Sequence, residues 1–291
     1  MKNKDSVTRL RNLIISLAIF VALALYASTY SEPVLRISLI PKELPSIERR
    51  KLKPLTDYLE KKIGMKIEFR PVADGAALVN ALAGNKLDMV WFDGFSFIQA
   101  RARSNDRVIP IVQRAEDEKT VSVFVTRRSD IKRLEDLKGR TFSFGPEASA
   151  SGHLMPRTHL LAAYIYPDTD MKPVFAGSPE ATVAAVAGGE ADAGVLDRSS
   201  WERLVAQGRA DPEAVHVFYV TPGYHDYSWT VYADMDLNLR LKLTDAFLAL
   251  DKNIGQEKEI LDLQGASKFI PTHAENYYAI ETAARRAGLV P

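Results

Sequence analysis

One loop of the sequence combines two serines, a glycine and a histidine in a pattern suited to holding an anion. Ser149, Ser151, Gly152 and His153 follow a short apolar run and lead into a segment with helical spacing. The free N–H groups of a helix N-terminus carry about half a positive charge, and the two hydroxyls add further donors. The loop therefore predicts an anion-binding turn, although serines in this position also suit a plain helix cap.

Carboxylates follow other expected strands at their carboxyl ends, which is where open α/β sheets bind ligands. Asp93 would receive a cationic ligand group or orient a donor, or it would be a solvated turn residue. Phe95 would form a pocket wall or belong to the core. The predicted ligand-binding residues are Asp93, Phe95, Ser149, Ser151, Gly152, His153, Asp197, Tyr224 and Asp226.

Signatures of the common enzyme classes are missing. The sequence has no G-x-G-x-x-G, P-loop, H-E-x-x-H or G-x-S-x-G motif. Its five histidines form no compact cluster with carboxylates that resembles a metal site. Asp93 with His153 is the one acid/base pair that can be proposed, and its spacing does not support it. We therefore expect no enzyme activity, no metal and no cofactor.

Composition is that of an ordinary folded protein. The chain has 291 residues, of which 46% are hydrophobic and 26% charged, and its formal net charge is +1. This length fits one large domain or two small ones, and the charge gives no sign of a nucleic-acid partner. Because there is no cysteine, disulfides, thiolate catalysis and cysteine–zinc sites are excluded.

The N-terminus has the pattern of an export signal. Lys2, Lys4, Arg9 and Arg11 precede an apolar run over residues 13–27. That run is long for a signal peptide and short for a membrane-spanning helix of roughly 20 residues. We predict that residues 1–31 are a signal peptide for export to the periplasm, or else an anchor that holds the chain on the inner membrane through residues 13–27.

The remaining chain alternates between strand and helix patterns. This alternation predicts an α/β class with largely parallel sheets. Two segments have similar patterns, residues 84–92 (GNKLDMVWF) and 189–196 (GEADAGVL). This similarity favours two similar lobes, although any α/β protein contains recurring helix–turn–strand segments. Strands are expected at 34–39, 65–71, 87–92, 108–113, 120–126, 140–144, 172–175, 193–196, 215–220 and 229–233. Helices are expected at 46–63, 76–83, 96–104, 152–163, 178–187, 199–207, 238–250, 257–263 and 273–288.

Six segments of the sequence carry a resemblance to a known family. They are KLDMVWF (86–92), PIVQRAEDE (110–118), DLKGRTFSFG (136–145), SGHLMPR (151–157), ATVAAV (181–186) and ASKFIPT (266–272). Together they resemble the extracytoplasmic solute-binding proteins of phosphonate, phosphite and selenate ABC transporters. The resemblance implies a two-lobed, type II-like periplasmic binding-protein fold with the ligand cleft between the lobes, no catalysis, and an ABC permease as partner. It also implies that an oxyanion would sit on the turn at residues 149–152.

Four positions depart from the family pattern. Ala150 replaces a threonine, Gly75 a tyrosine, Pro179 a histidine, and Asp93 stands where a glycine is common. The departures remove up to three donors and add a negative charge. We therefore hypothesise a ligand other than a bare tetrahedral oxyanion, either a larger molecule or one with a cationic group such as a zwitterion.

The predicted function is a solute-binding protein of an ABC transporter that takes up a small oxyanion or phosphonate-like solute by lobe closure. The alternative is a membrane-anchored sensing module for a signalling kinase with a diverged ligand. One lobe would comprise residues 32–125 plus 228–291, and the other residues 126–227.

Overall fold

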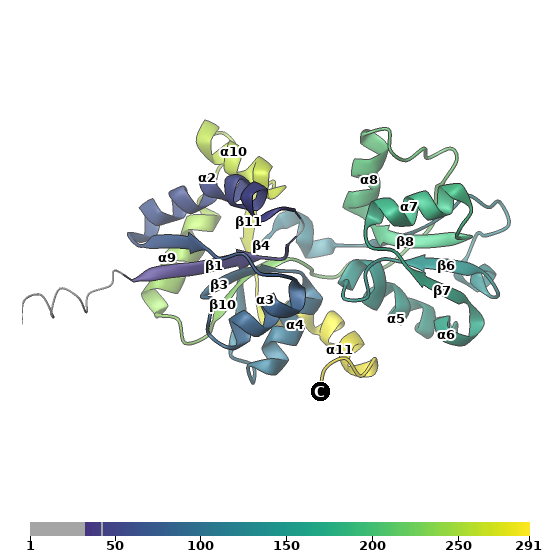
Figure 1. Ribbon diagram of the computed structural model, residues 1–291, viewed down its shortest axis with the longest axis horizontal. Helices are drawn as coiled ribbons and strands as arrows, with labels where there is room; N and C mark the ends of the chain where they lie inside the picture. Colours follow the sequence, from purple (N-terminus) through teal and green to yellow (C-terminus); the bar gives the residue numbers. More distant parts are fainter. Residues whose placement is uncertain (1–32, 42) are drawn as a thin grey trace, which may run out of the picture. The chain divides into compact units, whose positions relative to one another are not determined.

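The computed structural model describes residues 33–41 and 43–291, so the predicted signal peptide or anchor lies outside the described residues. Leu35–Pro291 forms one compact unit built on two β-sheets with helices on both faces (Figure 1). The predicted α/β class is confirmed. Below, each sheet together with its helices is called a lobe.

The first lobe contains a six-stranded sheet of order β11-β4-β10-β3-β1-β2. Helices α2, α9 and α10 pack on one face, and α3, α4 and α11 on the other. Its strands are β1 (Val34–Leu39), β2 (Lys66–Phe69), β3 (Met89–Phe92), β4 (Val108–Arg114), β10 (Ser228–Tyr232) and β11 (Phe269–Pro271). Its helices are α2 (Pro45–Ile63), α3 (Gly75–Ala83), α4 (Gly94–Arg103), α9 (Leu237–Leu248), α10 (Gly255–Gln264), the 3₁₀ turn η4 (Ala274–Tyr277) and α11 (Tyr278–Arg286).

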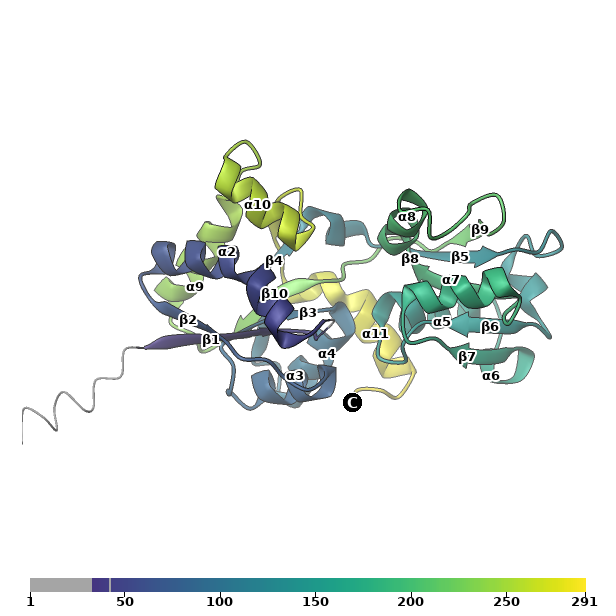
Figure 2. The same cartoon turned by 45° about the horizontal axis from the view of Figure 1, so that its top comes forward.

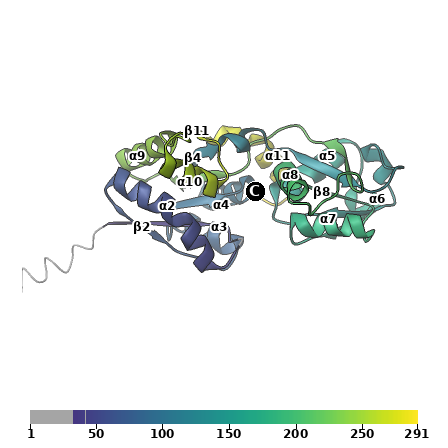
Figure 3. The same cartoon turned by 90° about the horizontal axis from the view of Figure 1, so that it is seen from above.

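The second lobe contains a five-stranded sheet of order β7-β6-β8-β5-β9. Helices α5 and α7 lie on opposite faces of this sheet (Figure 3). Its strands are β5 (Ser122–Thr126), β6 (Thr141–Phe144), β7 (Lys172–Phe175), β8 (Ala193–Asp197) and β9 (His216–Val220). Its helices are the 3₁₀ turn η2 (Leu134–Leu137), the π-helical turn η3 (Ala150–Leu154), α5 (Met155–Ala162), α6 (Pro167–Asp170), α7 (Pro179–Gly188) and α8 (Arg198–Ala206).

Both sheets are mixed, so the expectation of largely parallel sheets is wrong. Strands β1 and β3 are parallel, as are β6 and β8, but β10 is antiparallel to its neighbours β3 and β4, and β5 to β8 and β9. The reason is the path of the chain. Strands β3 and β8 end where the lobes meet, whereas β5 and β10 enter their sheets from that end and must run the opposite way.

Two segments connect the lobes, residues 115–121 and 221–227, here called the first and second crossovers. They run side by side, because the Tyr224 N–H donates to the Thr120 carbonyl (3.0 Å) and the Asp226 N–H to the Asp117 carbonyl (3.1 Å). The first crossover contains the 3₁₀ turn η1 (Ala115–Lys119).

The strand pairing bears on where one lobe ends and the next begins. The expected boundary at residue 125 falls inside β5, and all of β5 pairs within the second sheet. The expected boundary at residue 227 lies directly before the first residue of β10. The chain therefore enters the second sheet at Ser122, a few residues before the expected point.

One apolar cluster joins residues from both sides of the crossovers. Ala150 and Leu154 of η3 pack with Phe95 of α4, Tyr224 of the second crossover and Ile280 of α11. Helix α11 accordingly lies beside η3 and α5 (Figure 2). The turn predicted to bind an anion is thus held by core packing as well as by its own strand.

Local signals set most helix boundaries. In α2 one apolar face is buried, and the helix stops at Gly64, whose φ of 71° is the left-handed conformation that glycine adopts without strain. Pro54 lies inside α2 without ending it. The helix begins at Pro45, one residue before the expected start, because proline suits the first helical position.

Candidate functional site

Two equivalent carboxylates stand at the ends of the central strands of the two lobes. Asp93 follows β3 and caps α4 by accepting the N–H of Ser96 (2.7 Å). Asp197 ends β8 and caps α8 by accepting the N–H of Ser200 (2.8 Å). Both predicted residues therefore lie at the carboxyl edge of a sheet, where their side chains also satisfy helix termini.

A second carboxylate reaches the N-terminus of α4 from the second crossover. Asp226 is only 1% exposed, and its Oδ1 accepts the N–H of Gly94 (2.9 Å). Burial raises the pKa of Asp226 well above its usual value, and the negative charges of Asp93, Asp117 and Asp197 raise it further. The structure thus brings three predicted residues, Asp93, Asp197 and Asp226, into one acidic cluster.

The predicted anion-binding turn is shaped by two glycines. The Gly145 N–H donates to the Gly152 carbonyl (2.8 Å), and a Cβ added to either glycine would lie 3.0 Å from the other's Cα. Ser149 caps the turn by accepting the Gly152 N–H (2.9 Å). The segment from Ala150 to Leu154 is a π-helical turn, not the plain α-helix expected from residue 152. Such turns widen the backbone and are frequent at functional sites.

Ser151 is tied to the crossovers through a tyrosine and a second serine. The Ser122 hydroxyl donates to the Ser151 carbonyl (2.7 Å) and lies 3.1 Å from the Tyr224 hydroxyl. Burial raises the pKa of Tyr224 well above 10, with Asp226 adding to the effect. The predicted residues Ser151 and Tyr224 are therefore neighbours, and both are nearly buried.

His153 is half-buried between a backbone carbonyl and two aromatic rings. Its Nδ1–H donates to the Glu147 carbonyl (2.9 Å), and its ring packs edge-on against Phe144 (5.2 Å) and Phe175 (5.0 Å). Burial lowers the pKa of His153. Because Asp93 instead caps α4, the structure gives no support to an acid/base pair of Asp93 and His153.

Two predicted positions turn out to contribute to the core. Phe95 is 2% exposed and packs in the apolar cluster described above, not on an open wall. Ala150, a departure from the family pattern, is 1% exposed in the same cluster. Its methyl group is therefore part of the core packing beneath the turn.

The sequence analysis missed Arg114 and Asp117, which lie beside the acidic cluster. Arg114 Nε and Nη2 donate to the two carboxylate oxygens of Asp117, at 2.6 and 2.8 Å. Their spacing of three residues at the end of a strand was a usable signal, because it lets a guanidinium reach back to a carboxylate.

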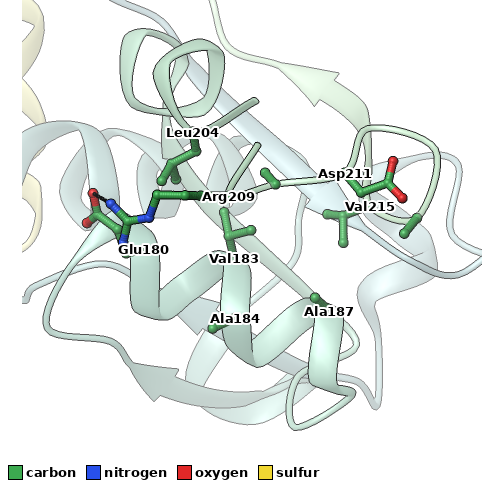
Figure 4. Close-up of a pocket in the computed structure, with 10 residues that line it drawn as sticks. Glu180, Val183, Ala184, Ala187, Leu204, Arg209, Asp211 and Val215 are labelled. Carbon is green, nitrogen blue, oxygen red and sulfur yellow. Dashed lines mark ion pairs between the residues drawn. The ribbon is translucent and has the colours of Figure 1, made fainter. Parts of the chain in front are cut away.

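Two surface cavities lie away from this cluster. One of about 210 Å³ lies between α7, α8 and the following loop, with Glu180 and Arg209 at one end and Asp211 at the other (Figure 4). Another is lined by residues of β1, β10 and α9, including Leu35 and Leu239. Neither contains a predicted ligand-binding residue.

Two further findings concern metals and membranes. Within residues 33–41 and 43–291, no group of three histidine, aspartate or glutamate side chains could hold a metal ion. In that same part of the chain, no helix is both long enough and apolar enough to cross a bilayer.

Comparison with known proteins gives one family and several related structures. The family model for the periplasmic substrate-binding protein of phosphonate ABC transporters matches residues 37–277. A probable ABC transporter phosphite-binding protein of Prochlorococcus marinus (strain MIT 9301) is 32% identical over 285 residues, covering 91% of this chain and 96% of that protein.

Solved structures agree with this match. PhnD1 from Prochlorococcus marinus in complex with methylphosphonate has a TM-score of 0.76, at 32% identity, covering 88% of this chain and 99% of that one. A binding-protein component of a phosphonate ABC transporter from Pseudomonas aeruginosa has a TM-score of 0.70 at 20% identity, covering 87% and 86% of the two chains, which supports the fold alone. The predicted two-lobed periplasmic binding-protein fold is confirmed.

Proposed function

The chain belongs to the family of periplasmic substrate-binding proteins of phosphonate ABC transporters, and from this premise we propose that its ligand is a small phosphonate carrying a positive charge. The family's role is binding for transport, not catalysis. The same matches favour transport over the sensing alternative.

The observation that carries the proposed ligand class is the buried carboxylate of Asp226. This side chain is held beside Asp93, Asp117 and Asp197, and like charges in a buried site raise each other's energy. A cationic group bound among them would relieve that repulsion. A bare oxyanion in the same place would add to it.

The N-terminus of α4 is already occupied by the chain's own carboxylates. Asp226 accepts the Gly94 N–H and Asp93 accepts the Ser96 N–H. In many proteins such N–H groups hold an anionic ligand. Their use here favours a ligand whose end facing the first lobe is positive.

The phosphonate oxygens would lie on the turn at residues 149–153. The Ser149 hydroxyl accepts the Gly152 N–H, which leaves its own proton to be donated to a ligand oxygen. The turn leads directly into α5, whose N-terminal dipole favours an anion. In this arrangement the ligand has its negative end toward the second lobe and its positive end toward Asp93 and Asp226.

A comparison of two ligands tests the proposal. Ethylphosphonate and 2-aminoethylphosphonate differ only in the ammonium group, and their dissociation constants can be measured by calorimetry. A charged hydrogen bond of about 1.5–3 kcal/mol predicts that the amino compound binds roughly 10- to 150-fold more tightly. Equal affinities, or a preference for ethylphosphonate, would sink the proposed ligand class.

Variants locate the effect. Asp226→Asn keeps the shape of the side chain and should remove most of the preference for the amino compound. Asp57→Asn changes an exposed carboxylate that pairs with Lys53 on α2, and should leave the preference unchanged.

A double variant tests the departures from the family pattern. Gly75 has open space around its Cβ position, so a tyrosine fits there. Gly75→Tyr combined with Asp93→Gly restores the family residues and should improve binding of methylphosphonate.

For location, we propose that the chain is exported and released into the periplasm after cleavage following Ser31. The proposal rests on the basic residues before the apolar run at 13–27 and on the small residues Thr29 and Ser31. Cell fractionation and the mass of the mature chain test it. Recovery of the full-length chain in the inner-membrane fraction would favour the anchored alternative.

A further inference from the structure

Arg114 is the last residue of β4, directly before the first crossover, and its guanidinium is bound on several sides. Nε and Nη2 donate to Asp117, and Nη1 donates to the Gln264 carbonyl at the end of α10 (3.1 Å). The Arg114 side chain is 22% exposed and the Asp117 side chain 5%. Because both side chains are largely buried, this ion pair is not a solvated surface contact.

Two aromatic rings complete the surroundings of Arg114. Its Cζ lies 5.3 Å from the ring centre of Trp91 and 5.4 Å from that of Tyr227. The two rings stack on each other, with centres 5.7 Å apart and planes 15° apart. Trp91 belongs to β3 and Tyr227 to the second crossover. Arg114 thus contacts a strand of the first lobe and one residue of each crossover.

These contacts lead directly to the acidic cluster. The carbonyl of Asp117 accepts the N–H of Asp226, and Asp226 then accepts the N–H of Gly94 at the start of α4. Tyr227 is the next residue after Asp226.

The positive charge of Arg114 also interacts with the carboxylate of Asp226. Burial lowers the pKa of Arg114, but the hydrogen bonds and charge of Asp117 outweigh it and leave the pKa raised, with Asp226 contributing. Asp226 is faced by charged or titratable groups from every element around it: Asp93 of α4, Arg114 of β4, Asp117 of the first crossover, Asp197 of β8, and Tyr224 and Tyr227 of its own segment.

We infer that Arg114 is a positioning residue for ligand binding, which sets the place and the charge state of Asp226 through Asp117 and Tyr227. The inference rests on the proposed function, since it assigns Arg114 to the carboxylate that would receive the ligand's positive group. Arg114 itself is enclosed by its partners and acts through them.

Arginine is required because its contacts use the whole guanidinium. A planar group with five donors can bind both carboxylate oxygens of Asp117, reach a carbonyl and still present its face to aromatic rings. A lysine at this position would keep the charge but only part of this geometry. Charge and geometry can therefore be separated by substitution.

Three variants make the test: Arg114→Lys, Arg114→Gln and the control Arg101→Lys, which changes an arginine of α4 that pairs with the exposed Asp106. The probe is 2-aminoethylphosphonate, measured by calorimetry from pH 5 to pH 8. The ligand's cation needs an ionised Asp226, so wild-type affinity should rise with pH through the pKa of Asp226. Arg114→Lys should lose about tenfold or more in affinity with nearly the same pH midpoint, because it keeps the charge.

Arg114→Gln should lose affinity and also move the midpoint to higher pH, because a carboxylate without its nearby cation takes up a proton more readily. Arg101→Lys should change neither quantity. A merely structural role for Arg114 would lower the melting temperature of the ligand-free protein without moving the midpoint. Wild-type affinity in Arg114→Lys, or an unmoved midpoint in Arg114→Gln, overturns the inference.

A ligand-free measurement separates this inference from the proposed function. The pH dependence of urea unfolding reports on Asp226 without any ligand. It should differ between Arg114→Gln and the wild type, and Asp117→Asn serves the same purpose if Arg114→Gln does not fold. An unchanged pH dependence in both variants overturns the inference whatever the ligand is. Failure to prefer 2-aminoethylphosphonate over ethylphosphonate overturns only the proposed function.

Discussion

The segments 88–96 of the first lobe and 192–200 of the second are built alike. In the first, Asp88 before β3 accepts the backbone N–H of Arg36 on β1 (2.6 Å). In the second, Asp192 before β8 accepts the backbone N–H of Thr141 on β6 (2.9 Å). Each segment then ends in the helix-capping aspartate described above. The two sequence patterns are thus alike because each places one aspartate before a strand, where it accepts a backbone N–H, and another after the strand, where it caps a helix.

The two segments differ in what else reaches the helix N-terminus. At α8, Asp197 is joined by the hydroxyl of Ser199, which donates to its Oδ1 (2.6 Å). At α4, Asp93 is joined by a second carboxylate, Asp226, from more than a hundred residues away. The N-terminus of α8 therefore binds one carboxylate, whereas the N-terminus of α4 binds two. The extra carboxylate of the first lobe thus comes from a segment outside the shared structural unit.

The largest effect is expected from the buried residue that precedes each cap. Phe92 is fully buried and Leu196 is 2% exposed. Phe92→Ala should cost about 3–5 kcal/mol and Leu196→Ala about 2–5 kcal/mol, because each leaves a cavity. Urea unfolding measures both. A loss below 1 kcal/mol at either position would show that the two segments are not equivalent core elements.

A smaller loss of stability is expected when the aspartates that precede β3 and β8 are replaced by alanine. Asp88 accepts three hydrogen bonds from Arg36, at 2.6–2.8 Å, whereas Asp192 accepts one from Thr141 and a longer one from Arg128 (3.2 Å). Alanine at either position leaves a backbone N–H unpaired and should cost about 1–3 kcal/mol, with the larger loss for Asp88→Ala. Equal losses in chemical denaturation would contradict this ranking.

The pH dependence of stability should come from the first lobe's extra carboxylate. Because the pKa of Asp226 is raised, the folded state holds its proton more tightly than the unfolded chain does. Its contribution to stability is fully present below the unfolded pKa and is lost as pH rises through the folded pKa, with a slope of at most about 1.4 kcal/mol per pH unit. Asp226→Asn should abolish this slope between pH 4 and pH 8 and stabilise the protein at neutral pH.

Asp57→Asn is the matched control, since Asp57 is an exposed carboxylate. It should retain the wild-type slope. A wild-type slope in Asp226→Asn would mean that Asp226 does not cause the loss of stability with rising pH.

The smallest effect should distinguish the two caps themselves. Asp197→Ala should cost about 1 kcal/mol, the usual value for a lost cap. Asp93→Ala loses the same cap but also removes a negative charge beside Asp226, so its net cost should be smaller. Unfolding free energies at neutral pH measure the difference. An equal or larger loss for Asp93→Ala would contradict the charge difference between the two helix termini.

Much of the local structure could be predicted from periodicity and capping. The expected strands at 34–39 and 172–175 match β1 and β7, and most other elements differ by a few residues at their ends. The missed pieces are short. Strand β11 has three residues and α6 has four, too few to show a period. The π-helical turn at 150–154 was missed because it depends on the approach of Gly145 to Gly152.

The sequence by itself determined the α/β class, the two related units, and the placement of Asp93, Asp197 and the serine turn at the ends of strands. These features can be predicted because hydrophobic periodicity and helix capping depend on residues that are close together in the sequence. Only the tertiary structure decided that the sheets are mixed, that Phe95 belongs to the core, and that Asp226 hydrogen-bonds both Asp117 of the first crossover and Gly94 of α4. Those outcomes depend on the two crossovers lying side by side, and contacts between segments more than a hundred residues apart leave no local pattern.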